Sequence, residues 1–187
     1  SRYLKDENAM QNYFLDEGIR AVKVIRDDEE LDAETVNQWV HGLDDYVSRV
    51  HRLFRRYPAE ILDAFLYICG GKATDDSDIE RLKAFLTETY LDMSIEDISL
   101  TSESLNLQVK IRGDEKYVSL PLDIAQENPQ LLESFNRIND MVTLPLTLKS
   151  GNLVREVQTL IESHPMLLSL AQKGWDVQRY KGLGEMN

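Results

Sequence analysis

The chain has one cysteine, a deficit of basic residues and no long apolar run. Cys69 cannot form an internal disulfide, and its place at the end of the apolar run 65–69 predicts a buried, unreactive thiol. A lone thiol fits a reducing compartment, so the cytoplasm is the expected location. No stretch approaches the roughly 18 apolar residues of a membrane span, and no signal peptide opens the sequence, so no membrane partner is expected.

The charge is strongly unbalanced. The 187 residues include 33 acids and 21 bases, which gives a formal net charge of −12. An acidic surface repels phosphate, so nonspecific coating by nucleic acid is disfavoured and any contact with DNA needs a local basic strip. The length fits one good-sized domain or two small ones, and the apolar and charged fractions are those of an ordinary globule.

The usual patterns of catalytic and metal-binding sites are missing. The three histidines have no partner at a metal-ligand spacing, and no G-x-S-x-G elbow occurs. The acidic run 75–78 fails as an EF-hand, which needs glycine at its sixth position and glutamate at its twelfth. Counted from Asp76, those places hold Arg81 and Thr87. The run is therefore interpreted as the start of a helix, with no catalytic residue and no metal site in the chain.

Hydrophobic periodicity predicts an α+β fold, a helix-rich globule with a small antiparallel hairpin or sheet. A capping box S-x-x-E at Ser77 is expected to open one of the helices, and Pro58 to be the first residue of another. Gly18 and Gly174 are expected to end helices, and His164-Pro165 to interrupt one. Acidic residues 27–30 should form a turn. Helices are expected over residues 8–17, 32–57 (with Asp32 as N-cap), 59–69, 77–91, from 129, over 153–161 and again up to 173. Strands are expected over residues 19–25, 105–111, 117–122 and 175–180.

The helix expected over residues 32–57 has two contrasting sides. Its apolar stripe consists of Leu43, Tyr46, Val47, Val50, Leu53, Phe54 and Tyr57. The opposite side carries Arg49, Arg52, Arg55 and Arg56. Two interpretations stay open. The arginines are the solvated side of an amphipathic helix, with Asp45 pairing to Arg49, or they contact phosphates or an acidic partner.

The last ten residues form a highly specific string, Gln-Arg-Tyr-Lys-Gly-Leu-Gly-Glu-Met-Asn at positions 178–187. It resembles the segment that closes the toprim domain in the B subunits of bacterial DNA gyrase, a type IIA topoisomerase family. Residues 3–10, 55–58 and 117–123 resemble further landmarks of the Gram-negative form more loosely. The chain begins without methionine and stops after this string, so it is expected to be a piece of a longer protein.

The resemblance implies an insert within the toprim region. Residues 1–7 would be a flanking segment, 8–174 the insert domain, and 175–187 a re-entry strand with the Tyr-Lys-Gly-Leu-Gly motif. The parent enzyme, two A and two B subunits, would negatively supercoil DNA with ATP and Mg²⁺. The fragment itself is expected to be inactive and to bind no cofactor. Its expected role is architectural, bracing the enzyme and contacting DNA or the A subunit.

The resemblance also suggests roles for residues of the closing string. Arg179 and Lys181 are candidates for phosphate contact or electrostatic support. The motif residues with an expected structural role are Tyr180, Gly182, Gly184 and Asn187; the glycines would permit close backbone approach, and the asparagine would cap a following helix. The alternative hypothesis is a free-standing acidic interaction domain that binds a basic partner.

Overall fold

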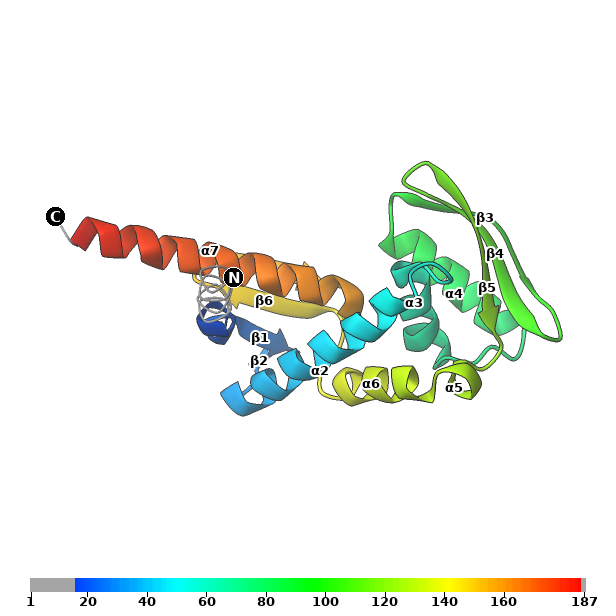
Figure 1. The fold of residues 1–187 in the computed structure, drawn as a ribbon, viewed down its shortest axis with the longest axis horizontal. Helices are drawn as coiled ribbons and strands as arrows, with labels where there is room; N and C mark the ends of the chain where they lie inside the picture. The colour runs from blue at the N-terminus through cyan, green and yellow to red at the C-terminus, as the bar shows by residue number, and fades with distance from the viewer. Residues whose placement is uncertain (1–15, 186–187) are drawn as a thin grey trace, which may run out of the picture. The chain divides into compact units, whose positions relative to one another are not determined.

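The computed structural model describes residues 16–185, which form an α+β fold of helices and two small antiparallel sheets (Figure 1). The chain divides into two compact units. Unit 1 comprises residues 16–41 and 141–185 of the described chain, and unit 2 comprises residues 42–140. The boundary lies within helix α2 (Ala33–Arg52). Most of the helix expected over residues 8–17 lies outside the described residues.

Unit 1 contains a four-stranded antiparallel sheet in the order β2-β1-β6-β7. Its central pair aligns Val24 with Leu148, and both side chains are fully buried. In a sheet with one solvated face, buried and exposed positions alternate along each strand. The strands are β1 (Lys23–Arg26), β2 (Glu29–Glu30), β6 (Leu146–Ser150) and β7 (Leu153–Val157).

Helix α7 (Leu160–Glu185) packs against β6 and β7 (Figure 1). The predicted interruption at His164-Pro165 is wrong: α7 continues through Pro165, which lies inside the helix and cannot donate a backbone hydrogen bond to the preceding turn. Buried Leu160 and Leu167 hold the helix on either side of the proline. Gly174 does not end the helix either. A Cβ there would lie 3.2 Å from Ser150 Oγ, so this glycine marks close packing.

Unit 2 contains a three-stranded antiparallel sheet in the order β3-β4-β5. Its strands are β3 (Met93–Leu100), β4 (Ser104–Ile111) and β5 (Asp114–Pro121). The predicted hairpin is confirmed as β4 and β5, with Leu107 opposite Val118 and both buried. The connecting turn uses positive φ at Arg112 and Gly113 (50° and 85°), which suits the twist of a tight hairpin.

Four helices accompany this sheet in unit 2: α3 (Ala59–Cys69), α4 (Asp76–Thr89), α5 (Ile124–Glu127) and α6 (Pro129–Asn139). Helix α4 packs against β3 and α3. The helix predicted over residues 59–69 is confirmed as α3, and Gly70 after it adopts the left-handed conformation (φ 65°) that favours glycine. Pro58 is the residue before α3 and not its first residue.

Several predicted boundaries are wrong. Helix α2 ends at Arg52, and residues 53–56 form a turn. Phe54 therefore leaves the apolar stripe and is 62% exposed. Residues 16–20 are helical through Gly18, so the strand expected over 19–25 begins only at Lys23. The acidic turn at 27–30 is shorter, because Glu29 and Glu30 pair with β1.

The largest corrections concern residues 153–185. The helix predicted over 153–161 is strand β7 followed by the start of α7. The strand predicted over 175–180, and the re-entry strand over 175–187 as far as it is described, are helical. Short stretches of mixed apolar and polar residues fit both periodicities, and packing on the sheet decides between them. Among the described helices, none is both long and apolar enough for a transmembrane segment.

Candidate anion-binding surface at the end of helix α2

Four arginines gather at the end of α2 and in the turn that follows it: Arg49, Arg52, Arg55 and Arg56, here called the arginine surface. All four belong to unit 2. Basic residues suit the end of a helix, where the unpaired carbonyls carry partial negative charge. The turn is held by backbone hydrogen bonds from Leu53 N to Val50 O (3.0 Å) and from Tyr57 N to Leu53 O (2.8 Å).

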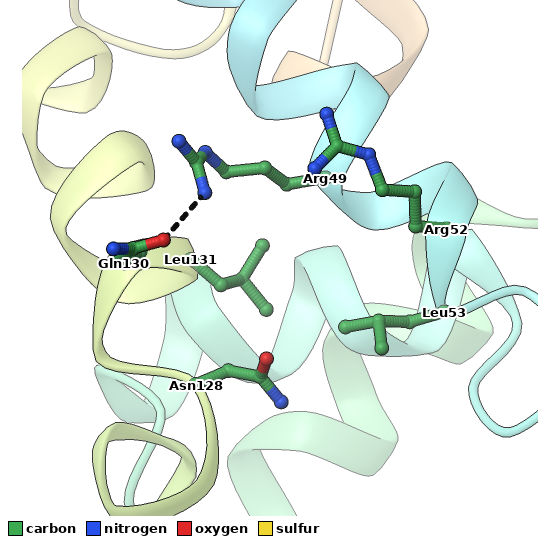
Figure 2. Close-up of a pocket in the computed structure, with 6 residues that line it drawn as sticks. All are labelled: Arg49, Arg52, Leu53, Asn128, Gln130 and Leu131. Atoms are coloured by element: carbon green, nitrogen blue, oxygen red, sulfur yellow. Dashed lines mark hydrogen bonds between the residues drawn. The ribbon is translucent and has the colours of Figure 1, made fainter.

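Arg49 is fixed from two sides. Its Nε donates to Asp45 Oδ2 at 3.1 Å, one turn earlier, as the sequence predicts. Its Nη1 donates to Gln130 Oε1 on α6, also at 3.1 Å (Figure 2). With one carboxylate partner and one amide partner, Arg49 connects the two helices, and its charge is partly neutralised. The structural interpretation of this arginine is therefore supported.

Arg52 borders a shallow pocket of about 230 Å³ on the same surface. The pocket is lined by Arg49, Arg52, Leu53, Asn128, Gln130 and Leu131. Figure 2 shows Arg49 reaching across to Gln130, whereas the Arg52 head group lies apart from it. The lining contains no acid, and Arg52 is exposed, with no hydrogen bond or ion pair to any residue between 16 and 185. Arg52 thus keeps its full charge for a ligand.

Arg55 lies over the ring of the residue before it, and Arg56 lies over the ring of the residue after it. The Arg55 Cζ is 5.8 Å from the centroid of Phe54, and the Arg56 Cζ is 5.2 Å from that of Tyr57. Cation–π contact orders a guanidinium without neutralising it. Arg56 also lies 3.9 Å from Glu127, whereas no ion pair joins Arg55 to the described residues. Arg52 and Arg55 are therefore the uncompensated cations of the arginine surface.

Tyr57 links the arginine surface to helix α5. Its hydroxyl donates to Glu127 Oε2 at 3.1 Å. Burial, and secondarily the nearby Glu127 carboxylate, raise the pKa of Tyr57, while Arg56 opposes this shift. Because the tyrosine stays protonated at neutral pH, it serves as a donor that positions Glu127 beside Arg56.

The arrangement favours binding of an oxyanion and offers no group for covalent chemistry. Guanidinium groups donate paired hydrogen bonds to phosphate and carboxylate. The lining of the pocket contains no nucleophile and no carboxylate that could act as a general base. Within residues 16–185, no group of three or more histidine, cysteine or carboxylate side chains is placed to hold a metal ion.

The acidic run 75–78 caps a helix, as the sequence predicts, but through different residues. Asp75 accepts hydrogen bonds from Ser77 N (2.9 Å) and Asp78 N (3.2 Å), and Asp78 accepts one from Thr74 N (2.8 Å). The capping box predicted at Ser77 is therefore wrong: the box is formed by Asp75 and Asp78. Hydrogen bonds lower the pKa of both carboxyls, led by Ser77 for Asp75 and by Thr74 for Asp78.

Cys69 carries no sign of reactivity. Its side chain is half-buried, and burial raises the pKa of the thiol to about 11. A thiol with such a pKa is protonated at neutral pH, and the protonated form is a poor nucleophile. The raised pKa favours the unreactive thiol expected from its apolar neighbours, whereas the predicted full burial is wrong.

The candidates in the closing string belong to unit 1 and lie on α7. The Arg179 Cζ is 5.4 Å from the Trp175 ring, Tyr180 is 81% exposed, and Lys181 is exposed. Gly182 and Gly184 are exposed helical residues with open space where a Cβ would be. Outside the adjacent residues of α7, no atom of residues 16–185 lies close to either position, and the close backbone approach expected for these glycines stays a prediction. Asn187 lies outside the described residues.

Sequence reasoning missed the part of the site that other helices contribute. Asn128, Gln130 and Glu127 lie more than 70 residues along the chain from the arginines they accompany. Nothing in a single sequence connects them to α2, because the juxtaposition comes from tertiary packing. In a comparison with known protein families, no family model matches the chain.

Proposed function

We propose that this chain is a non-catalytic module of the B subunit of a bacterial DNA gyrase, and that its arginine surface contacts the DNA backbone. The observation that carries the contact is the uncompensated charge of Arg52 and Arg55 in a chain of net charge −12. The family assignment rests on the resemblance of residues 178–187 to the closing toprim segment. Under this proposal the enzyme is an ATP-dependent, cytoplasmic topoisomerase that negatively supercoils DNA.

The proposal assigns the chemistry to other parts of the enzyme. ATP hydrolysis and Mg²⁺-dependent DNA cleavage belong to domains beyond this chain, and the module contributes architecture and electrostatics. The excess of acidic residues in the rest of the chain supports a contact that is confined to the arginine surface. Because the rest of the surface repels phosphate, DNA would be drawn only to the arginine surface.

Phosphate is a better match than a base edge for this surface. Arg52 and Arg55 are exposed, and Arg52 borders an open pocket with an apolar side formed by Leu53 and Leu131. Contacts of this kind position a duplex and do not read sequence. The expected interaction is therefore independent of DNA sequence and strongly dependent on salt.

The test uses the assembled enzyme of two A and two B subunits. Arg52→Glu/Arg55→Glu reverses the two uncompensated charges, and Lys83→Glu/Lys110→Glu is the control, because it makes the same charge change at exposed positions of the same unit. The arginine variant should bind DNA more weakly. The slope of log affinity against log salt should fall in magnitude by roughly 0.9 for each phosphate that the arginines no longer neutralise.

The contact proposal fails if the arginine and lysine variants show the same salt dependence and the same supercoiling rate. A contact with the A subunit would instead lower the affinity between subunits and leave the salt slope unchanged. The family assignment is tested separately by the gene downstream of codon 187, which must continue in the same reading frame through the rest of a toprim domain.

A further inference from the structure

A second cavity lies in unit 1, lined by β1 and by the first turns of α2, and is here called the β1 cavity. It has a volume of about 420 Å³, and most of its lining is aliphatic. Cavities of a few hundred Å³ with mostly apolar walls and a few polar groups are typical of small-molecule sites. Its larger aliphatic side chains are the buried Val22 and Val36 and the half-buried Ile19, Leu31 and Val40.

The charged residues that line the β1 cavity leave one cation uncompensated. Arg20 pairs with Glu17 at 2.9 Å, so its charge is partly neutralised. Lys23 is exposed, and no ion pair joins it to any residue between 16 and 185. Glu30 also lines the cavity, but in the sheet it lies opposite Ile25 and not opposite Lys23. Lys23 therefore keeps its charge for a ligand.

The cross-strand neighbour of Lys23 is a second lysine. Lys149 on β6 is its register partner, which places the two side chains on the same face of the sheet, with Cβ atoms about 4.5–5.5 Å apart. Lys149 is exposed as well, and within residues 16–185 it has no ion pair. Like charges directly opposite each other destabilise a sheet. An anion bound by both ammonium groups would offset this repulsion.

We propose that the β1 cavity and the Lys23–Lys149 pair together bind a small amphiphilic anion. The apolar body of the ligand occupies the cavity, and its single carboxylate contacts the two lysines. Charge complementarity supports this ligand, because two uncompensated cations are adjacent here in a chain of net charge −12. The aliphatic walls distinguish it from DNA, whose backbone has no apolar body that could enter the cavity. The proposal is independent of the arginine surface, which belongs to unit 2.

Isothermal titration calorimetry of the full 187-residue chain with octanoate tests the proposal. One octanoate should bind per chain, and the affinity should rise by about fourfold for each methylene added between butanoate and octanoate, because each methylene leaves water. Octylammonium has the same alkyl chain and the opposite charge, and it should bind at least tenfold more weakly. Equal affinities for the two octyl compounds, or affinities that do not depend on chain length, would overturn the proposal.

Lys149→Glu tests the position of the carboxylate. The substitution converts the like-charged pair into an oppositely charged one, so it should raise the melting temperature of the free protein by up to about 4 °C. The same substitution should weaken octanoate binding at least tenfold. Lys83→Glu makes the same charge change at an exposed position of unit 2 and is the control, with octanoate affinity unchanged. Wild-type affinity in Lys149→Glu would overturn the proposal.

Ala33→Phe tests the position of the apolar body. Ala33 is exposed and lines the β1 cavity, so a larger side chain should fill the space of the ligand and lower the affinity at least tenfold. Gln38→Phe is the control, because Gln38 is exposed on the same helix and does not line the cavity. Circular dichroism verifies that both variants fold. Equal octanoate affinities in the two variants would overturn the proposal.

Vesicles separate a free ligand from a lipid surface, since both can present an anionic group beside apolar chains. The protein should not sediment with phosphatidylglycerol vesicles at protein concentrations where it binds octanoate. Sedimentation with these vesicles in the absence of octanoate binding would overturn the proposal, because the ligand would then be a membrane.

Discussion

The hydroxyl of Tyr46 lies 2.5 Å from Oδ1 of Asp63, and the pair connects α2 to α3 inside unit 2. Tyr46 is 0% exposed and Asp63 is 1% exposed. Carboxylates are almost never this deeply buried unless they are paired. The tyrosine hydroxyl donates the hydrogen bond. Tyr46 thus contributes its ring to the packing of the core and its hydroxyl to a buried polar contact.

Tyr46→Phe should lower the free energy of unfolding by about 1–3 kcal/mol. The substitution keeps the ring and removes one donor from a buried carboxylate, whose desolvation is then less well compensated. Denaturant unfolding at pH 7 measures the effect. Tyr67→Phe is the control, since the Tyr67 side chain is only half-buried and should change stability by less than about 0.5 kcal/mol. Equal effects of the two substitutions would contradict the role of the pair.

The same hydrogen bond predicts a loss of stability in alkaline solution. Burial, and secondarily the charge of Asp63, raise the pKa of Tyr46 well above its usual value of 10.0. The unfolded chain loses this proton near pH 10 while the folded chain keeps it. The free energy of unfolding therefore falls above pH 10, by up to about 1.4 kcal/mol per pH unit from this one group. Tyr46→Phe lacks this titration, so the difference in unfolding free energy between wild type and variant should shrink between pH 10 and pH 11; parallel curves would count against the assignment.

Asp78→Ala should destabilise unit 2 at neutral pH and have less effect in acid. Asp78 accepts hydrogen bonds from Thr74 and pairs with Arg81 at 2.6 Å, and a loss of about 1–2 kcal/mol is expected. Its pKa is lowered from 3.8, so its contribution is present above that value and is lost as the pH falls through the folded pKa. Unfolding measured at pH 7 and at pH 2.5 (about one unit below the usual carboxyl pKa) should show the gap closing. Glu80→Ala on the same helix is the control, with a small effect at both pH values.

Gly182→Ala/Gly184→Ala should increase the helix content of the chain. Both glycines lie in α7 with open space around the added Cβ, and alanine favours a helix over glycine by up to about 1 kcal/mol per residue. Circular dichroism at 222 nm measures the change. If these glycines instead adopted a non-helical backbone conformation that requires glycine, the substitutions would give no gain in helix and a lower stability.

The sequence was sufficient where one periodicity dominated. Leu105, Leu107 and Val109 alternate strictly with polar residues, and the structure contains the corresponding strand. Helix α6 was expected after Pro129 and begins there. Strand β3 was missed, because its register shifts between Ile95 and Asp97 and its side chains are mostly exposed or half-buried. Without a continuous buried face, a strand leaves no alternating pattern to detect.

The sequence was misleading where local signals competed with packing. Gly174 and Pro165 resemble helix breaks, yet α7 continues through both because its buried leucines and Ala171 pack in unit 1. For the candidate site, the arginines were found from their spacing alone. The distinction among them was not available from the sequence. It depends on the carboxylates of Asp45 and Glu127, which pair with Arg49 and Arg56, and on the Gln130 amide, which accepts a hydrogen bond from Arg49.

The order of strands in unit 1 has a consequence for biosynthesis. Strand β1 pairs with β6, so Lys23 must meet Lys149 after all of unit 2 has been translated. Unit 2 is one uninterrupted segment and can fold while the ribosome is still adding β6. Early folding of that segment would shorten the loop that β1 and β6 have to close, which lowers the entropy cost of pairing them. A substitution that slows the folding of residues 42–140 would therefore lengthen the time during which β1 is not paired with β6. An unpaired strand edge is prone to aggregation.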